Sequence, residues 1–342
     1  MFLNILITVD CEKSGLINNL NGNYPYCIEG YLETGRYAIV NISKTVSITQ
    51  PVNLIKIMDF DSANTFYRQL KACVLLLKDG IVVDSLAGPF SGGYNFLGNE
   101  ANIKGYWYLQ GRSHIIVQGG NYQMVVKIAG HPEMVASCVV PQRVDIQKID
   151  TSVNKNLNGN SFIPPGDSIQ GDTLYGVYSY NYILTFTDPS SIQNYYRLEN
   201  YTIGKKSEYK IGSYFNTWLN TPFYMDVTNE NLFENRYVNG GFVYFCPFFS
   251  DKLINGTQQT LNLNLMSISD SLVSINLVSI SQGYYERLKS EDLYESNLDN
   301  AYSTPVQMYS NFTNAAGFLA GRTVSSDTIR IPYFIGVVHN PY

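Results

Sequence analysis

The feature that most constrains the fold of this chain is a two-residue alternation of apolar and polar side chains. Residues 261–265 read LNLNL and residues 273–277 read VSINL, with a turn near residue 270 between them. Successive side chains of a β-strand point to opposite faces of its sheet, so this pattern is typical of strands with one buried face. These residues therefore predict an antiparallel pair of strands.

Turn signals divide the first half of the chain into further hairpins. Residues 26–50 contain two apolar runs on either side of a Thr-Gly pair at 34–35. Residues 71–87 contain two runs joined by Asp-Gly at 79–80, which is a strong signal for a tight hairpin. Both segments are predicted to form antiparallel strand pairs.

A third group of strands follows these hairpins. Apolar and polar residues alternate over 121–128, apart from the apolar Val125, and neighbouring strands are expected at 114–118 and 134–140. Together with the hairpins they predict an immunoglobulin-like β-sandwich of about seven strands over residues 24–141.

The second half of the chain repeats the strand pattern after a polar, Asn- and Gly-rich stretch at 150–173, which is predicted to be a linker or a long loop. Strands are expected at 180–189 and near 328–335. An apolar stripe of two tyrosines and a leucine predicts a short helix near 282–294. The fold prediction is an all-β protein, with a second β-rich domain over 142–342 that contains one short helix.

Composition limits the function classes. Charged residues make up 15% of the chain and the net charge is −5, so a nucleic-acid partner is not expected, since it would require a basic face. Apolar residues make up 45%, which is enough for sizeable cores. The sequence contains no apolar run of the length of a membrane-spanning helix.

The sequence predicts neither a catalytic site nor a metal site. His114, His131 and His339 lie far apart and have no metal-ligand spacing, so no metal and no cofactor are expected. The GDSIQG segment at 166–171 contains a serine, but its glycine spacing differs from that of a nucleophile elbow. We therefore expect a binding protein rather than an enzyme.

The N-terminus has some features of a bacterial lipoprotein signal. Residues 1–9 are apolar apart from one asparagine, and Cys11 follows as the candidate lipidation site. No basic residue precedes the apolar run, and Asp10 stands where a small residue is usual. Residues 1–23 are predicted to be a signal, lipid-anchor and tether segment, and the alternative is a first strand at 2–9.

The remaining cysteines are Cys27, Cys73, Cys138 and Cys246. The first three lie in apolar, strand-like surroundings, where a cysteine behaves as a small hydrophobic residue. Buried thiols are therefore expected in preference to disulfides, although four cysteines would also permit two bridges.

Clusters of aromatic residues are the best candidates for partner binding, because exposed aromatic side chains anchor many interfaces. The run FVYFCPFF at 242–249 follows two glycines and is either a partner-facing loop or a core strand. The candidate partner-binding residues are Trp107, Trp218, Phe242, Tyr244, Phe245, Phe248 and Phe249.

The order of these segments resembles a family of Bacteroidetes outer-membrane lipoproteins, catalogued as the domain-of-unknown-function 4249 family. The resemblance covers nearly the whole chain and rests on structural rather than catalytic segments. They are CEK from residue 11, YCIEGYLETGRYAIVNISKTV from 26, YQMVVKIAGHPEMVASCVVPQRVDIQKID from 122, TFTDPSSIQNYYRL from 185, SINLVSISQGYYERLK from 274 and STPVQMYSNFTNAAGFLAGRTVSSDTIRIP from 303.

The resemblance implies a lipid-anchored protein on the extracellular face of the outer membrane, with an immunoglobulin-like or prealbumin-like N-terminal domain. Family members are commonly encoded beside TonB-dependent transporters, which implies an accessory or docking role on such a transporter. Two alternatives stay open: a free-standing glycan-binding or adhesion protein, and an enzyme of unrecognised type.

Six Asp-(Ser/Thr)-apolar triplets also resemble the O-glycosylation acceptor sequence of this bacterial phylum. They begin at Asp61, Asp84, Asp167, Asp172, Asp270 and Asp327.

Overall fold

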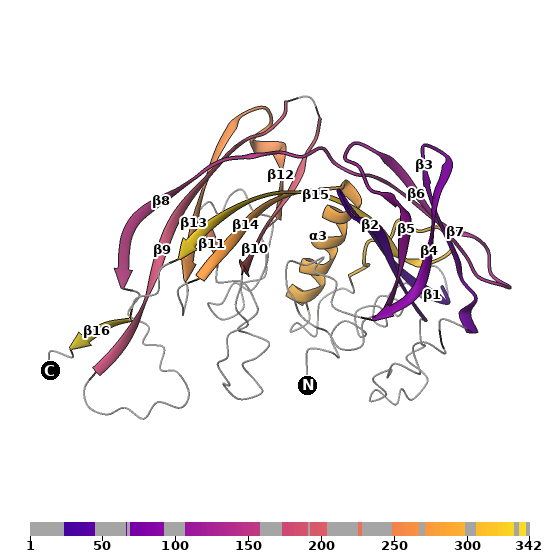
Figure 1. Cartoon of the computed structure of the whole chain (residues 1–342), viewed down its shortest axis with the longest axis horizontal. Helices are drawn as coiled ribbons and strands as arrows, with labels where there is room; N and C mark the ends of the chain where they lie inside the picture. The colour runs from indigo at the N-terminus through magenta and orange to yellow at the C-terminus, as the bar shows by residue number, and fades with distance from the viewer. Residues whose placement is uncertain are drawn as a thin grey trace.

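A computed structural model shows a protein built mostly of β-strands, which confirms the all-β prediction. The described residues are 24–44, 66, 69–91, 107–157, 173–190, 192–203, 225–227, 248–266, 271–297, 306–331 and 335–339. Within them the strands form a large sheet and a smaller sheet, and helix α3 (Gln282–Asn297) lies between two β-rich units (Figure 1). No helix in these ranges is long and apolar enough to cross a membrane.

The N-terminal unit is a β-sandwich in which the large sheet folds over on itself. In the sheet the strands follow the order β15-β1-β2-β5-β4-β3-β6-β7. Their bounds are β1 (Tyr26–Glu33), β2 (Tyr37–Lys44), β3 (Cys73–Lys78), β4 (Ile81–Ser91), β5 (Trp107–Ile115), β6 (Asn121–Lys127), β7 (Met134–Val139) and β15 (Ala316–Ile331). The hairpins predicted at 26–50 and 71–87 are β1–β2 and β3–β4.

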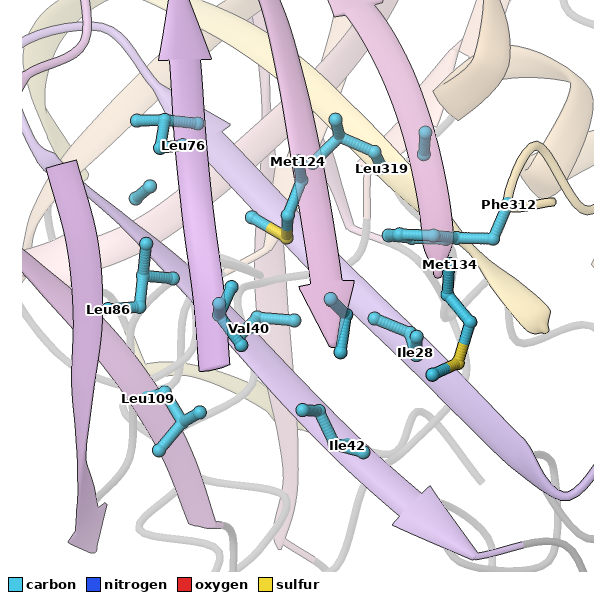
Figure 2. Packing of buried hydrophobic residues seen from close by; sticks show 14 of the residues in the cluster. Ile28, Val40, Ile42, Leu76, Leu86, Leu109, Met124, Met134, Phe312 and Leu319 are labelled. Atoms are coloured by element: carbon cyan, nitrogen blue, oxygen red, sulfur yellow. The ribbon is translucent and has the colours of Figure 1, made fainter. Parts of the chain in front are cut away.

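Alternate side chains from both layers of this sandwich meet in one core. Ile28 and Val40 come from the first two strands, Leu76 and Met124 come from β3 and β6, and Leu319 comes from β15 (Figure 2). All five are buried. Burial of such aliphatic side chains contributes roughly 1.5–3 kcal/mol each, so this core dominates the stability of the unit.

The turns form where the sequence supplies residues that accept a positive φ. Gly35 has φ +84° between β1 and β2. Asp79 and Gly80 have φ of +51° and +82° between β3 and β4. Two successive positive φ angles match the right-handed twist of a two-residue hairpin, which is why Asp-Gly predicted this turn correctly.

Strand β15 connects the two units. Its first residues, Ala316–Arg322, pair in parallel with β1, whereas Arg322–Ile331 pair antiparallel with β14 (Ser271–Ile280). The sequence predicted a strand only near 328–335 in this part of the chain, and so missed most of β15. Small residues such as Ala316 and Gly317 have weak strand propensity, and pairing with β1 overrides it.

The C-terminal unit packs a second sheet against the end of the large one. The smaller sheet contains β8 (Ile146–Leu157), β9 (Thr173–Thr187), β11 (Met225–Val227), β13 (Gln258–Met266) and β16 (Ile335–His339), while β10 (Tyr195–Ile203) and β12 (Phe248–Ser250) extend the large sheet beyond β14. The polar stretch predicted as a loop at 150–173 begins inside β8, where backbone pairing with β9 supports a strand of polar composition.

Helix α3 confirms the short helix predicted near 282–294. Ser281 precedes it, and the Ser281 hydroxyl accepts hydrogen bonds from the Tyr284 and Gly321 amides. Tyr284 and Tyr285 are buried against Phe318 of β15 and its neighbours. The helix therefore covers the face of β15 that points away from the core of the N-terminal sandwich.

Candidate functional site

The structure places the sequence-predicted aromatic residues in different settings. Phe248 and Phe249 form β12 and are buried in the interior, where the Phe249 ring lies 5.1 Å from that of Tyr196. Trp107 begins β5 and pairs with Ser91. The other candidates fall outside the described residues, and they are Trp218, Phe242, Tyr244, Phe245 and the lipidation candidate Cys11.

A buried carboxylate organises one end of the C-terminal unit. Asp188, the acid of the TFTDP segment, accepts hydrogen bonds from the Tyr196 hydroxyl and from the Asn194 side-chain amide at 3.2 Å. Its second oxygen accepts one from the Gly256 amide at 2.9 Å. Asp251 accepts another from the Asn194 amide at 2.7 Å. These contacts join the loop after β9 to the loop after β12.

The electrostatics of this cluster match a structural role. Burial, followed by the contact with Asp188, raises the pKa of Tyr196 above its ordinary range, so its hydroxyl keeps its proton and donates. Burial also raises the pKa of Asp251. Each carboxylate accepts a hydrogen bond from a backbone N–H of another loop residue, an arrangement that fixes loops rather than presenting an acid or base to a substrate.

A second buried cluster spans three strands beneath α3. The Arg322 guanidinium of β15 lies 3.1 Å from Glu33 of β1 and 3.0 Å from Glu199 of β10. Arg197 lies 3.4 Å from Glu199 and donates a 2.6 Å hydrogen bond to the Tyr284 hydroxyl of the helix. The cluster therefore ties both units and α3 to the strand that connects them.

The charge state of Arg322 follows from its neighbours. Burial alone would lower the pKa of Arg322, but the carboxylates of Glu199 and Glu33 outweigh it, and the pKa is raised. The guanidinium thus stays charged, with its carboxylate partners in direct contact.

In the part of the chain whose side chains the structure describes, neither His114 nor His131 belongs to a group of metal ligands. Nε2 of His114 lies 3.0 Å from the Tyr122 hydroxyl, which also accepts a hydrogen bond from the Val117 amide. The His131 ring packs edge-on against Tyr26. In the part of the chain that the structure describes, no three His, Cys, Asp or Glu side chains gather as metal ligands.

The described cysteines differ in how far their thiols are exposed to solvent. Cys27 and Cys138 are buried thiols, as the sequence predicted, whereas Cys73 begins β3 as an exposed thiol. Burial raises the pKa of Cys138 to about 12. Cys246 lies outside the described residues.

Large aliphatic side chains lie exposed on the N-terminal sandwich, and the sequence analysis did not predict them as a binding feature. Val82 and Val139 are 54% and 58% exposed, at strand positions rather than in flexible loops. The signal was present in the sequence, because Val125 breaks the alternation of its strand and the run at 74–77 does not alternate at all. Exposed apolar patches on folded domains often mark interaction sites.

Comparisons with known proteins show the family to which this chain belongs. The family described as Domain of unknown function (DUF4249) matches residues 24–328. No curated protein matches the chain. A solved structure of a "Putative membrane anchored protein" from Corynebacterium diphtheriae has 9% identity and a TM-score of 0.19 over 93% of this chain, a likeness too low to carry an argument. This chain covers 59% of that protein's chain.

Proposed function

Because the chain belongs to the DUF4249 family, we propose that it is a non-catalytic cell-surface lipoprotein that acts as a docking subunit of a TonB-dependent outer-membrane transporter. Cys11 would carry the lipid that holds the protein at the extracellular face of the outer membrane. The docking role would place its folded part against the transporter and help to capture or retain cargo.

One observation supports the binding role. Buried charged side chains have hydrogen-bond or ion-pair partners within the fold, whereas aliphatic side chains lie exposed on its surface. Asp84, Asp188 and Arg322 are buried and engaged by backbone amides or by opposite charges. Val82 and Val139 stand exposed on strands β4 and β7. A surface of this kind gains free energy by burial against a partner protein.

The experiment that tests the proposal is an affinity pull-down of the tagged, full-length protein from gently solubilised native outer membranes. Mass spectrometry should recover a TonB-dependent barrel in near-equimolar amount, and an unrelated tagged lipoprotein from the same membranes should not recover it. If the tagged protein emerges alone in several mild detergents, the docking role is wrong.

A further inference from the structure

The N-terminal sandwich has two outward faces, and the structure covers them unequally. On the layer that contains β1 and β15, the outward residues Tyr31 and Phe318 pack beneath helix α3. The opposite layer, β4-β3-β6-β7, has no such helix among the described residues. Figure 1 shows β3, β6 and β7 on the side of the unit away from α3.

Strand register defines the outward side chains of this opposite layer. Val74, Leu76, Met124 and Ala136 point into the core, so their alternate neighbours point outward. Across the strands, Leu75 pairs with Val125, Val125 pairs with Val135, and Leu77 pairs with Val82. Val139 is a further outward residue of β7, four positions after Val135. We call this set the outer face; it comprises Leu75, Leu77, Val82, Val125, Val135 and Val139.

The centre of the outer face is a row of three aliphatic residues on neighbouring strands, and Gln123 and Ser137 lie between this row and Val139. Val125 is only 7% exposed although it belongs to no core cluster, because Leu75 and Val135 flank it on the neighbouring strands. Val82 and Val139 lie toward the margins and are more than half exposed. In an antiparallel sheet with one face in water, the outward residues are normally polar. Here six of the outward residues are aliphatic.

The charges around the outer face limit the chemistry of a partner. Lys127 and Glu133 at one margin are bound to each other at 2.7 Å. Gln123 donates a hydrogen bond to Ser137 between the aliphatic rows. A charged partner surface would lose its hydration here without gaining an opposite charge, so the matching surface is uncharged and aliphatic.

The size of the patch argues against a second copy of the chain as the occupant. The whole outward surface of these four strands, polar positions included, has about six residues per strand at about 3.4 Å each and strands about 4.8 Å apart, which gives roughly 20 Å by 20 Å, or about 400 Å². A stable interface buries about 800 Å² on each partner. Two outer faces pressed together would therefore bury about half of the area that a stable dimer needs.

We propose that the outer face of β4-β3-β6-β7 docks the protein onto its partner, through an uncharged aliphatic protein surface. This inference rests on the proposed function and names the surface that performs it. Leu75, Val125 and Val135 form the centre, with Val82 and Val139 as the exposed contacts that a partner would bury.

The experiment repeats the membrane pull-down with Val82→Asp/Val139→Asp. The matched control is Ile192→Asp/Leu272→Asp, which places two carboxylates at aliphatic positions of similar exposure in the C-terminal unit. The outer-face variant should recover at least tenfold less barrel, and the control should recover as much as wild type. Thermal unfolding of both variants should match wild type, since all four positions are substantially exposed.

Cys73 supplies a second measurement that needs no variant. It is exposed on β3 at an outward position, in line with Leu75 and Leu77. Maleimide labelling read by peptide mass spectrometry should modify Cys73 at least tenfold more slowly in native membranes than in the purified protein, while Cys138 stays unmodified in both.

The outcomes separate the two proposals. Equal recovery of the barrel by wild type and the outer-face variant, with Cys73 equally reactive in both settings, overturns this inference and leaves the docking function standing. Recovery of no barrel by wild type overturns both. A dimer of the purified protein in sedimentation equilibrium that Val82→Asp/Val139→Asp abolishes also overturns it, in favour of a second copy.

Discussion

Asp84 carries a full charge at a buried position because the backbone surrounds it with donors. Its two oxygens accept hydrogen bonds from the amides of Ser85, Arg112, Ser113 and His114, at 2.8–3.0 Å. Burial alone would raise the pKa of Asp84, but these four amides outweigh it, and the pKa is lowered. The carboxylate thus secures the end of β5 against β4.

We expect Asp84→Asn to lower the free energy of unfolding by about 1–3 kcal/mol at neutral pH, because an amide replaces an acceptor of four backbone donors. Since the pKa of Asp84 is lowered in the fold, its contribution is present above the carboxyl pKa of the unfolded chain and is lost as pH falls through the folded value. Urea unfolding of variant and wild type at neutral pH and near pH 3 checks this, and the difference should shrink in acid.

Asp327→Asn is the matched control for this prediction. Asp327 begins another of the Asp-(Ser/Thr)-apolar triplets, but it is exposed and accepts a hydrogen bond only from the next amide in the chain, that of Thr328. Its substitution should change stability by about 0.5 kcal/mol or less. Equal losses for the two variants would contradict the role assigned to Asp84.

Gly317 is required for a different reason. It has φ +106°, and a Cβ there would collide with the backbone of Ile28 on β1. We expect Gly317→Ala to cost about 3 kcal/mol or more, since strain and overpacking combine. Gly35→Ala tests the strain alone, because Gly35 also has a positive φ but open space around it, and it should cost about 1–2 kcal/mol. Denaturant midpoints that are equal for both variants would refute the collision argument.

Elements are joined in this protein by charge as well as by apolar packing. Arg322 on β15 contacts Glu33 on β1 and Glu199 on β10. Arg322→Met leaves both carboxylates buried without their shared cation, and we expect a loss of about 3–5 kcal/mol in the free energy of unfolding. Guanidinium unfolding followed by circular dichroism measures it.

Arg36→Met is the control for Arg322→Met. Arg36 pairs with the same Glu33 at 2.7 Å, but its side chain is 48% exposed. Because water screens this pair, its loss should cost at most about 1 kcal/mol. A comparable loss in both variants would mean that burial does not set the strength of this cluster.

Short-range sequence patterns predicted the local elements and missed the distant ones. The hairpins at 26–50 and 71–87 and helix α3 each depend on residues close in the chain, namely turn residues and an apolar stripe. Strand β15 depends on β1 and β14, which lie far from it in sequence, so its small residues gave no local signal. The outer face escaped notice for a related reason, since its six residues come from four strands whose order only the fold reveals.

At the scale of the whole molecule, the N-terminal unit is incomplete without the C-terminal part of the chain. Phe312, Ala315 and Leu319 belong to its core, and β15 pairs along β1. The boundary predicted at residue 141 remains a prediction, and it can be tested directly. We expect a fragment of residues 24–141 to lack a cooperative unfolding transition, because one edge of its sheet and part of its core are missing.

Near-UV circular dichroism during thermal unfolding would show this loss against the full chain. Fusing residues 306–325 behind residue 141 through a flexible Gly-Ser linker should restore a transition, since it returns the missing strand and core residues. A cooperative transition in the unfused fragment would instead show that residues 24–141 fold independently.

The place of β15 in the chain also affects how the protein is made. A ribosome delivers β1 to β7 well over one hundred residues before it delivers the strand that completes their sandwich. Until then, the unpaired backbone edge of β1 and the apolar inner faces of both layers remain open to water and to other nascent chains. We expect the emerging polypeptide to depend on holding chaperones for most of its synthesis, and to gain resistance to proteases late and in a single step.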